Sequence, residues 1–273
     1  MDIFDVISNY GFFALIFLAF LSFVAGFIDS VVGGGGLIQL PALLINLPNA
    51  SIPTLFGTNK IAALAGTSIS AVQYSKKIKF NYKILFAIAF FAATASYLGA
   101  KTVSYMNVNT LKPLILAILI LIAIYTFFKK DLGSIQTKRL SQQKMLLYGS
   151  LIGLSIGFYD GFFGPGTGSF LVLAFVVVFG FEFVEASAYS KVINCVTNVF
   201  ALIVFIKQGD YIIELAIIMG VCNIIGNIIG TKMALKRGNT FVRTVFLVIV
   251  SLMIIRYGYD IFYSDFTQLF NEF

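Results

Sequence analysis

A pattern of glycine, aspartate and lysine occurs twice in the chain, and the second copy lies 131 residues after the first. The first copy joins G-F-I-D to four consecutive glycines and then to T-N-K, and the second joins G-F-Y-D to G-P-G-T-G and then to Y-S-K. The residues that keep the spacing are Gly26, Asp29, Lys60, Gly99 and Lys101, followed by Gly157, Asp160, Lys191, Gly230 and Lys232. We infer two halves of common origin, each with an acidic residue, a glycine break and a lysine in or beside a membrane segment.

The composition indicates that lipid surrounds most of the chain. The sequence is 59 % hydrophobic and 11 % charged, with a mean hydropathy of +0.95, whereas about a quarter of the residues in a soluble domain are charged. A length of 273 residues then predicts one compact bundle. The sequence has no histidine and no CxxC pair, so it offers no ligand set for zinc and no histidine for acid–base chemistry. The net charge of +7 comes from lysines in short loops and does not indicate nucleic-acid binding.

Apolar runs of roughly 20 residues predict eight long transmembrane helices. They are expected at about 11–32, 58–75, 82–104, 111–128, 145–163, 189–206, 211–231 and 241–262. The first run lacks a basic flank, so we interpret it as a retained helix and not as a cleaved signal peptide. A shorter apolar segment follows each glycine break, at 37–47 and at 169–181, and is either a re-entrant half-helix or a short crossing. The predicted fold class is an all-α polytopic membrane protein with two pseudo-symmetric repeats.

Basic loops indicate how the two halves are oriented. The predicted organisation is a first membrane repeat at 1–128, a cytoplasmic linker at 129–144 and a second membrane repeat at 145–273. The positive-inside rule places the linker and the lysines at 76–83 in the cytoplasm. If the short segments cross the membrane, the basic cluster at 232–243 also falls inside, which makes the repeats inverted with both termini outside. Eight spans with two re-entrant loops is the alternative.

The glycine breaks predict a cavity between the halves. A break in a membrane helix frees backbone amide and carbonyl groups, which lipid cannot satisfy, so the break must face protein or a water-filled cavity. The short helix after each break would aim its N-terminal amides and partial positive charge at that cavity, as suits a small anion. The alternative is that the glycines only allow close helix packing.

The charged residues of the two copies have both functional and structural interpretations. Asp29 and Asp160 precede the breaks and either serve the site, one of them as a proton carrier, or bond the freed amides. Lys60 and Lys191 are expected to open the third segment of each half, beside Asn59 and Ser190 as N-caps. A lysine in a first helical turn opposes the helix dipole, which favours either an anionic substrate or snorkelling to the headgroups.

Amide side chains continue the second copy along one helix face. Asn194 and Asn198 lie three and seven residues after the lysine, so they either bind an oxyanion or hydrogen-bond between helices. Asn223 and Asn227 are expected only to hydrogen-bond between helices.

These motifs, G-F-I-D-x-x-x-G-G-G-G, T-N-K and G-F-Y-D-G-F-F-G-P-G-T-G-S-F, resemble those of the TauE/SafE family of probable sulfite and organosulfonate exporters. The resemblance covers essentially the whole chain and implies a multi-pass secondary transporter of the bacterial inner membrane with a small sulfur-containing or carboxylate anion as cargo. The second triplet departs from T-N-K, so the halves are not expected to contribute equally. By position, the resemblance directs interest to Asp29, Gly33, Gly34, Gly35, Gly36, Asn59, Lys60, Asp160, Gly164, Gly166, Gly168, Ser190 and Lys191.

The expected function is therefore export of small anions, and the candidate substrate-binding residues are these thirteen with Asn194 and Asn198. Protons are the candidate coupling ion, and a homodimer is left open. An anion channel is the alternative, and an intramembrane enzyme is disfavoured because the sequence has no HExxH or DDxxD motif and no serine–histidine pairing. No GxxxxGK[ST] loop for ATP occurs, and no cofactor, metal or catalytic residue is expected.

Overall fold

The computed structural model describes residues 11–47, 49–103 and 140–271, and all regular structure within them is helical. The helices are α2 (Phe12–Val32), α3 (Gly36–Asn46), α4 (Ile52–Ser75), α5 (Tyr82–Thr102), α7 (Gln142–Phe162), α8 (Thr167–Ala174), the π-helix η2 (Phe175–Phe179), α9 (Phe183–Gln208) and α10 (Ile213–Asn271). The predicted span at 111–128 lies outside the described residues, as does most of the predicted linker at 129–144.

Five helical stretches in the described part of the chain are long and apolar enough to cross a membrane: α2, α5, α7, α9 and the segment Ile213–Leu252 of α10. Their outer faces expose large apolar side chains, among them Phe13 at 86 % and Phe86 at 79 % exposure. Such faces suit lipid, since water would strongly disfavour so many exposed apolar groups. The chain is accordingly a multi-pass membrane protein.

The glycine breaks lie where the sequence predicts them, and the short helices after them have the predicted lengths. α3 has 11 residues, and α8 continues through η2 to Phe179, so that the short segment of the second half is Thr167–Phe179. Each is shorter than the about 20 helical residues of an ordinary transmembrane crossing, so each is either a re-entrant half-helix or a short crossing, as the sequence predicts.

The predicted starts of the third helices are wrong. α4 begins at Ile52 and not near 58, because the Ser51 side chain caps it by accepting a hydrogen bond from the Thr54 amide at 3.2 Å. α9 begins at Phe183 and not near 189. The polar residues that the sequence predicts at the helix ends, Asn59 and Ser190, lie inside the helices.

A glycine divides the last long helix into two. Gly238 has φ 72° and ψ −162°, so α10 consists of one helix over 213–237 and another over 239–271. This positive φ is accessible to glycine with little strain and disfavours other residues. The division falls within the basic cluster at 232–243, where the sequence predicts a loop between its last two long spans.

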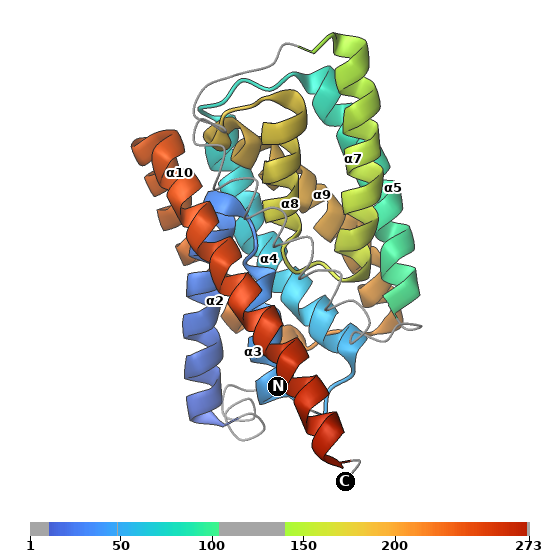
Figure 1. Ribbon diagram of the computed structural model, residues 1–273, viewed down its shortest axis with the longest axis vertical. Helices are drawn as coiled ribbons and strands as arrows, with labels where there is room; N and C mark the ends of the chain where they lie inside the picture. Colours follow the sequence, from blue (N-terminus) through green and yellow to red (C-terminus); the bar gives the residue numbers. More distant parts are fainter. Residues whose placement is uncertain (1–10, 48, 104–139, 272–273) are drawn as a thin grey trace.

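Two helix pairs form opposite edges of the bundle. In Figure 1, α5 and α7 lie side by side along one edge, α2 and α10 along the other, and α4 and α9 cross between them. Glycines allow the close approach within each pair: a Cβ added at Gly26 would lie 2.3 Å from the Asn223 carbonyl oxygen, and one at Gly157 would lie 2.7 Å from the Ala92 Cα. For these glycines inside helices, close packing is a sufficient explanation.

Candidate functional site

The two glycine breaks lie against each other at the centre of the bundle. A Cβ added at Gly33 would lie 2.2 Å from the backbone carbon of Gly168, so the two backbones touch where neither residue has a side chain. Gly33, Gly34, Gly164 and Gly166 have φ values between 77° and 100°, which glycine adopts without the strain of other residues. The breaks therefore form one structural unit although they are far apart in sequence.

A cavity lies between the breaks and the central helices. The space in it that the centres of water molecules can occupy is about 30 Å³. On the same measure, a cavity that holds one water needs about 10–15 Å³. The cavity therefore has room for a ligand of a few heavy atoms. The residues that line it are Asp29, Gly34, Gly35, Gly36, Gln39, Phe56, Asn59, Lys60, Ala63, Thr67, Asp160, Phe163, Gly164, Gly166, Thr167, Gly168, Asn194, Asn198 and Asn223.

Backbone amides at both breaks lack a protein acceptor. Among the described residues, the amides of Gly34, Gly35, Gly36, Gly166 and Gly168 donate no backbone hydrogen bond, whereas those of Gly33, Leu37, Gly164 and Thr167 do. Gly36 is half-buried and the other four residues are buried. A buried amide without a partner is disfavoured by about 1–3 kcal/mol, so these amides beside one cavity favour a molecule in it that accepts hydrogen bonds. The N-termini of α3 and α8 begin here, and helix N-termini favour negative charge.

One buried ion pair lies in the cavity wall. Lys60 Nζ donates to Asp160 Oδ2 at 3.1 Å and to Asn198 Oδ1 at 3.1 Å. Asn198 in turn donates to Asn194 Oδ1 at 2.7 Å. The side chains of Lys60 and Asp160 are only 4 % and 3 % exposed, so the lysine cannot snorkel to the headgroups, and that interpretation is wrong.

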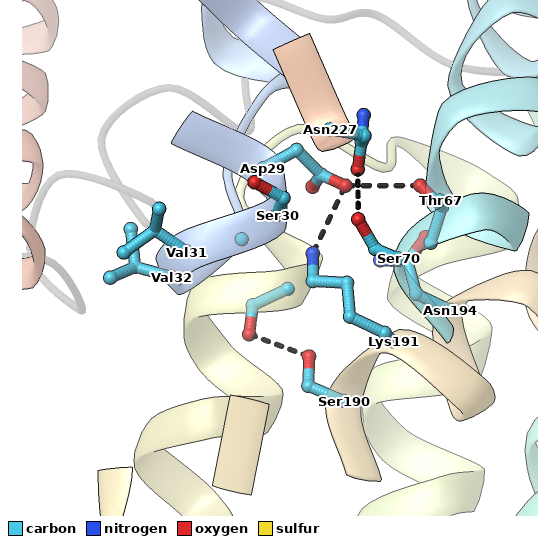
Figure 2. A network of polar contacts seen from close by, with 12 residues as sticks. Asp29, Ser30, Val31, Val32, Thr67, Ser70, Ser190, Lys191, Asn194 and Asn227 are labelled. Carbon is cyan, nitrogen blue, oxygen red and sulfur yellow. Dashed lines mark hydrogen bonds and ion pairs between the residues drawn. The ribbon is translucent and has the colours of Figure 1, made fainter. Parts of the chain in front are cut away.

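The second ion pair is the counterpart of the first. Figure 2 shows Asp29 between Lys191 and Thr67, with Oδ2 3.0 Å from Lys191 Nζ and accepting a hydrogen bond from Thr67 Oγ1 at 3.0 Å. Lys191 is fully buried, and its contact with Asp29 lacks hydrogen-bond geometry, so the interaction is electrostatic. Each lysine therefore pairs with the aspartate of the other sequence copy. Among the described residues, neither Asp29 nor Asp160 accepts a hydrogen bond from a backbone amide of the glycine breaks. The alternative in which the aspartates bond the freed amides is therefore wrong.

Twelve of the fifteen predicted residues line the cavity; Gly33, Ser190 and Lys191 do not. Gly33 supports the contact between the breaks, and Ser190 Oγ donates to the carbonyl oxygen of Gly168 at 3.1 Å (Figure 2). The predicted N-cap roles of Asn59 and Ser190 are wrong, because both residues lie two turns inside their helices.

Four polar residues of the wall are absent from the predicted set: Gln39, Thr67, Thr167 and Asn223. Gln39 donates to Ser22 Oγ at 3.1 Å and accepts from Asn223 Nδ2 at 3.3 Å, so Asn223 both hydrogen-bonds between helices and lines the cavity. Gln39 has a sequence signal, since it is a polar residue in an apolar helix one turn after the break. Asn223 has none, because its neighbours along the chain resemble those of any polar residue in a membrane helix.

The charges of the site sum to zero, with two lysines and two aspartates. The free amides and helix N-termini add positive potential to that balance, so the cavity favours an anion over a cation. Within the described residues, no group of three or more histidine, cysteine, aspartate or glutamate side chains could hold a metal ion.

The family profile and the curated relatives that match the chain all describe membrane transport proteins. Residues 18–257 match the sequence profile described as sulfite exporter TauE/SafE. The chain is 37 % identical over 248 residues to a probable membrane transporter protein, ORF9, of Sinorhizobium sp, which covers 90 % of this chain and 92 % of that one. It is 34 % identical over 241 residues to a probable membrane transporter protein of Haemophilus influenzae, with 88 % and 92 % covered. It is 34 % identical over 247 residues to the probable membrane transporter protein YfcA of Escherichia coli, with 89 % of each chain covered. No solved structure matches the chain.

Proposed function

The chain belongs to the sulfite exporter TauE/SafE family, and from this premise we propose that it is a secondary active transporter that exports small anions across the bacterial inner membrane. Sulfite and related sulfur oxyanions are the proposed cargo. The size of the cavity favours the smallest of these anions. Its volume of about 30 Å³, measured as the space open to the centres of water molecules, suits an ion of a few heavy atoms. A larger organosulfonate would require the cavity to widen.

The observation that carries the proposal is the convergence of unbonded amides and one lysine on a shared cavity. Five glycine amides without acceptors and the Lys60 ammonium border the same space. Amide dipoles and an ammonium bind an oxyanion through charge-assisted hydrogen bonds. We assign the anion to this space, with Lys60 and the amides of Gly34–Gly36, Gly166 and Gly168 as its ligands.

Reciprocal contacts support a pseudo-two-fold relation between the halves. Lys60 pairs with Asp160. The residues equivalent to these two in the other repeat, 131 positions away, are Lys191 and Asp29, and they also pair with each other. The close approaches between helices come in equivalent pairs as well. The contact of Gly26 with Asn223 corresponds to that of Gly157 with Ala92. The contact of Gly99 with Phe158 corresponds to that of Gly230 with Phe27. We propose two membrane repeats, 1–128 and 145–273, joined by a cytoplasmic linker at 129–144.

The repeats are proposed to be inverted, since only that topology places all the basic clusters in the cytoplasm. Reporter fusions test this directly: a reporter at the C-terminus is expected to be active outside the cytoplasm, and one inserted in the linker is expected to be active inside. A cytoplasmic C-terminus would reject the inverted arrangement.

Flux into proteoliposomes tests the function. The panel consists of sulfite, thiosulfate, sulfate, sulfoacetate and small carboxylates, each with and without a proton gradient. We expect gradient-dependent accumulation of sulfite, and we expect Lys60→Ala to abolish it. Lys101→Ala is the matched control, because that lysine is exposed and lies over the Tyr97 ring, away from the cavity.

Three results would contradict the proposal in different ways. Fast flux that only follows the anion's own gradient would indicate a channel. Absence of flux for the entire panel, with the protein correctly inserted, would remove the cargo class. Retained sulfite flux in Lys60→Ala would remove the lysine from the site.

A further inference from the structure

The two buried ion pairs differ in one respect, which is that only one of their lysines reaches the cavity. Lys60, Asp160 and Asp29 line the wall, whereas Lys191 is fully buried behind it. Lys60 donates to Asp160 and to Asn198, both at 3.1 Å. Within the described residues, an anion in the cavity therefore meets a single ammonium group, which Asp160 already engages.

From this geometry we propose that Asp160 takes up the proton that accompanies the anion, because the anion and the Asp160 carboxylate compete for Lys60. The inference rests on the anion transport proposed above. Lys60 stays an ammonium throughout, and its partner changes from the carboxylate to the anion. The bond that forms is the O–H bond of the protonated carboxyl group, and the bond that breaks is the one that holds this proton on a hydronium ion or a buffer acid in the solvent.

The charge balance of the site supports this exchange. In the absence of substrate, the two lysines and two aspartates sum to zero. Binding a monovalent anion would leave one negative charge in excess and a buried carboxylate without its counter-ion, which is strongly disfavoured. Protonation of that carboxylate restores the balance to zero, and two like charges in close contact favour neutralising one of them.

Asp29 does not face the same competition. It keeps Lys191 at 3.0 Å and the hydrogen bond from Thr67 at 3.0 Å. Because Lys191 does not line the cavity, an anion bound there cannot take the place of Asp29. The two aspartates, equivalent in the sequence repeat, thus have different roles: Asp160 exchanges its partner and Asp29 keeps it.

Lys60 is the charged group that contacts Asp160 in the described part of the chain. Of the other titratable side chains, Lys60 on α4 and Asp29 on α2 line the same cavity, and Lys191 on α9 pairs with Asp29. The remaining titratable groups include Cys195 on α9, Lys101 on α5 and Tyr159 on α7, none of which lines the cavity. Lys101 lies over the Tyr97 ring, and Cys195 lies 3.9 Å from Ser68 Oγ. The sequence of α8 carries no titratable side chain.

Proton uptake during anion binding tests the assignment. The purified protein is titrated calorimetrically with sulfite and with methanesulfonate, in two buffers of different ionisation enthalpy and at several pH values. Methanesulfonate has no titrating group near neutral pH, so protons counted with it belong to the protein. We expect the wild type to take up close to one proton per anion, and its affinity to fall by up to about tenfold per pH unit.

Three variants separate the roles of the carboxylates. Asp160→Asn is expected to bind sulfite at least as tightly as the wild type, since a competitor for Lys60 is gone, and to lose the protein's proton uptake. Asp29→Asn is expected to retain that uptake. Asp210 is the control outside the cavity, where it accepts a hydrogen bond from Thr54 at 3.4 Å, and Asp210→Asn is expected to match the wild type in affinity and uptake.

Proton uptake that persists in Asp160→Asn would overturn the proposal, as would weaker sulfite binding by that variant. Wild-type binding of methanesulfonate without proton uptake would overturn it too, and this measurement needs no variant to fold. Asp160→Glu retains a carboxyl group and is expected to retain the uptake. Failure of the wild type to bind either anion would contradict the proposed function itself, whatever the role of Asp160.

Discussion

Removal of the Lys191 ammonium group is predicted to destabilise the protein strongly. In Lys191→Met, Asp29 keeps only the hydrogen bond from Thr67, and its side chain is 13 % exposed, so little water can replace the lysine. Breaking a buried ion pair by removing one partner costs about 3–5 kcal/mol, a large part of a typical stability of about 5–15 kcal/mol. We expect about 3 kcal/mol, the lower end, because the threonine remains.

The double variant Lys191→Met/Asp29→Leu gives the decisive comparison. Replacing both charges by apolar side chains of similar size is often neutral for stability or even stabilising, so it should lie within about 1 kcal/mol of the wild type. The free energy of unfolding is measured by titrating mixed micelles with dodecyl sulfate and following the helical circular dichroism. Lys101→Met is the control, since an exposed cation–π contact contributes only about 0.5–1 kcal/mol.

A free energy of unfolding of Lys191→Met within about 1 kcal/mol of the wild type would contradict a strong stabilisation by this ion pair. A double variant as unstable as Lys191→Met would contradict it too, because the loss of stability would then come from packing and not from an unpaired charge on Asp29.

Backbone geometry gives two further matched comparisons. Gly33→Ala and Gly238→Ala both place a Cβ at a positive φ with ψ near 180°, which is disfavoured by about 1–3 kcal/mol, but only Gly33 has backbone within 2.2 Å of that Cβ. We expect Gly33→Ala alone to lose folded protein in fluorescence size-exclusion profiles, and equal losses would contradict the contact between the breaks. In α10, a Cβ at Gly226 would lie 2.1 Å from a carbonyl of α2, whereas one at Gly220 would have ordinary contacts at 3.7 Å. Thermal unfolding should therefore show Gly226→Ala to be destabilised and Gly220→Ala to be unchanged or stabilised by up to about 1 kcal/mol; the opposite order would refute the packing of α2 on α10.

The sequence predicts the breaks and most of the cavity wall because ionisable residues and glycine runs stand out in apolar segments. Asp29, Asp160 and Lys60 could be selected on that basis, since each is strongly disfavoured in lipid unless it faces the protein interior. The lengths of the two short helical segments follow from the same reading, because the apolar residues after the breaks end after 11 residues in α3 and at Phe179 in the second half.

The partners of these residues could not be predicted, because pairing depends on how the helices cross. Nothing local indicates that Lys60 reaches Asp160 in the other half and not Asp29 in its own. The error in the start of α4 has a related cause: Thr58 resembles a cap residue, but its hydroxyl donates to the Thr54 carbonyl and accepts from the Ile212 amide. A polar residue inside a membrane helix and one at its end look alike until their partners are known.

The location of the bound anion is the most direct test of the account. A structure determined with selenite, a heavier analogue of sulfite with anomalous scattering, would show where the ion binds. We predict one selenium peak between the breaks, with oxygens within hydrogen-bond distance of Lys60 Nζ and of the Gly34–Gly36 and Gly168 amides. An empty or water-filled cavity at saturating selenite, or an ion bound only elsewhere, would contradict the claim that these breaks form an anion site.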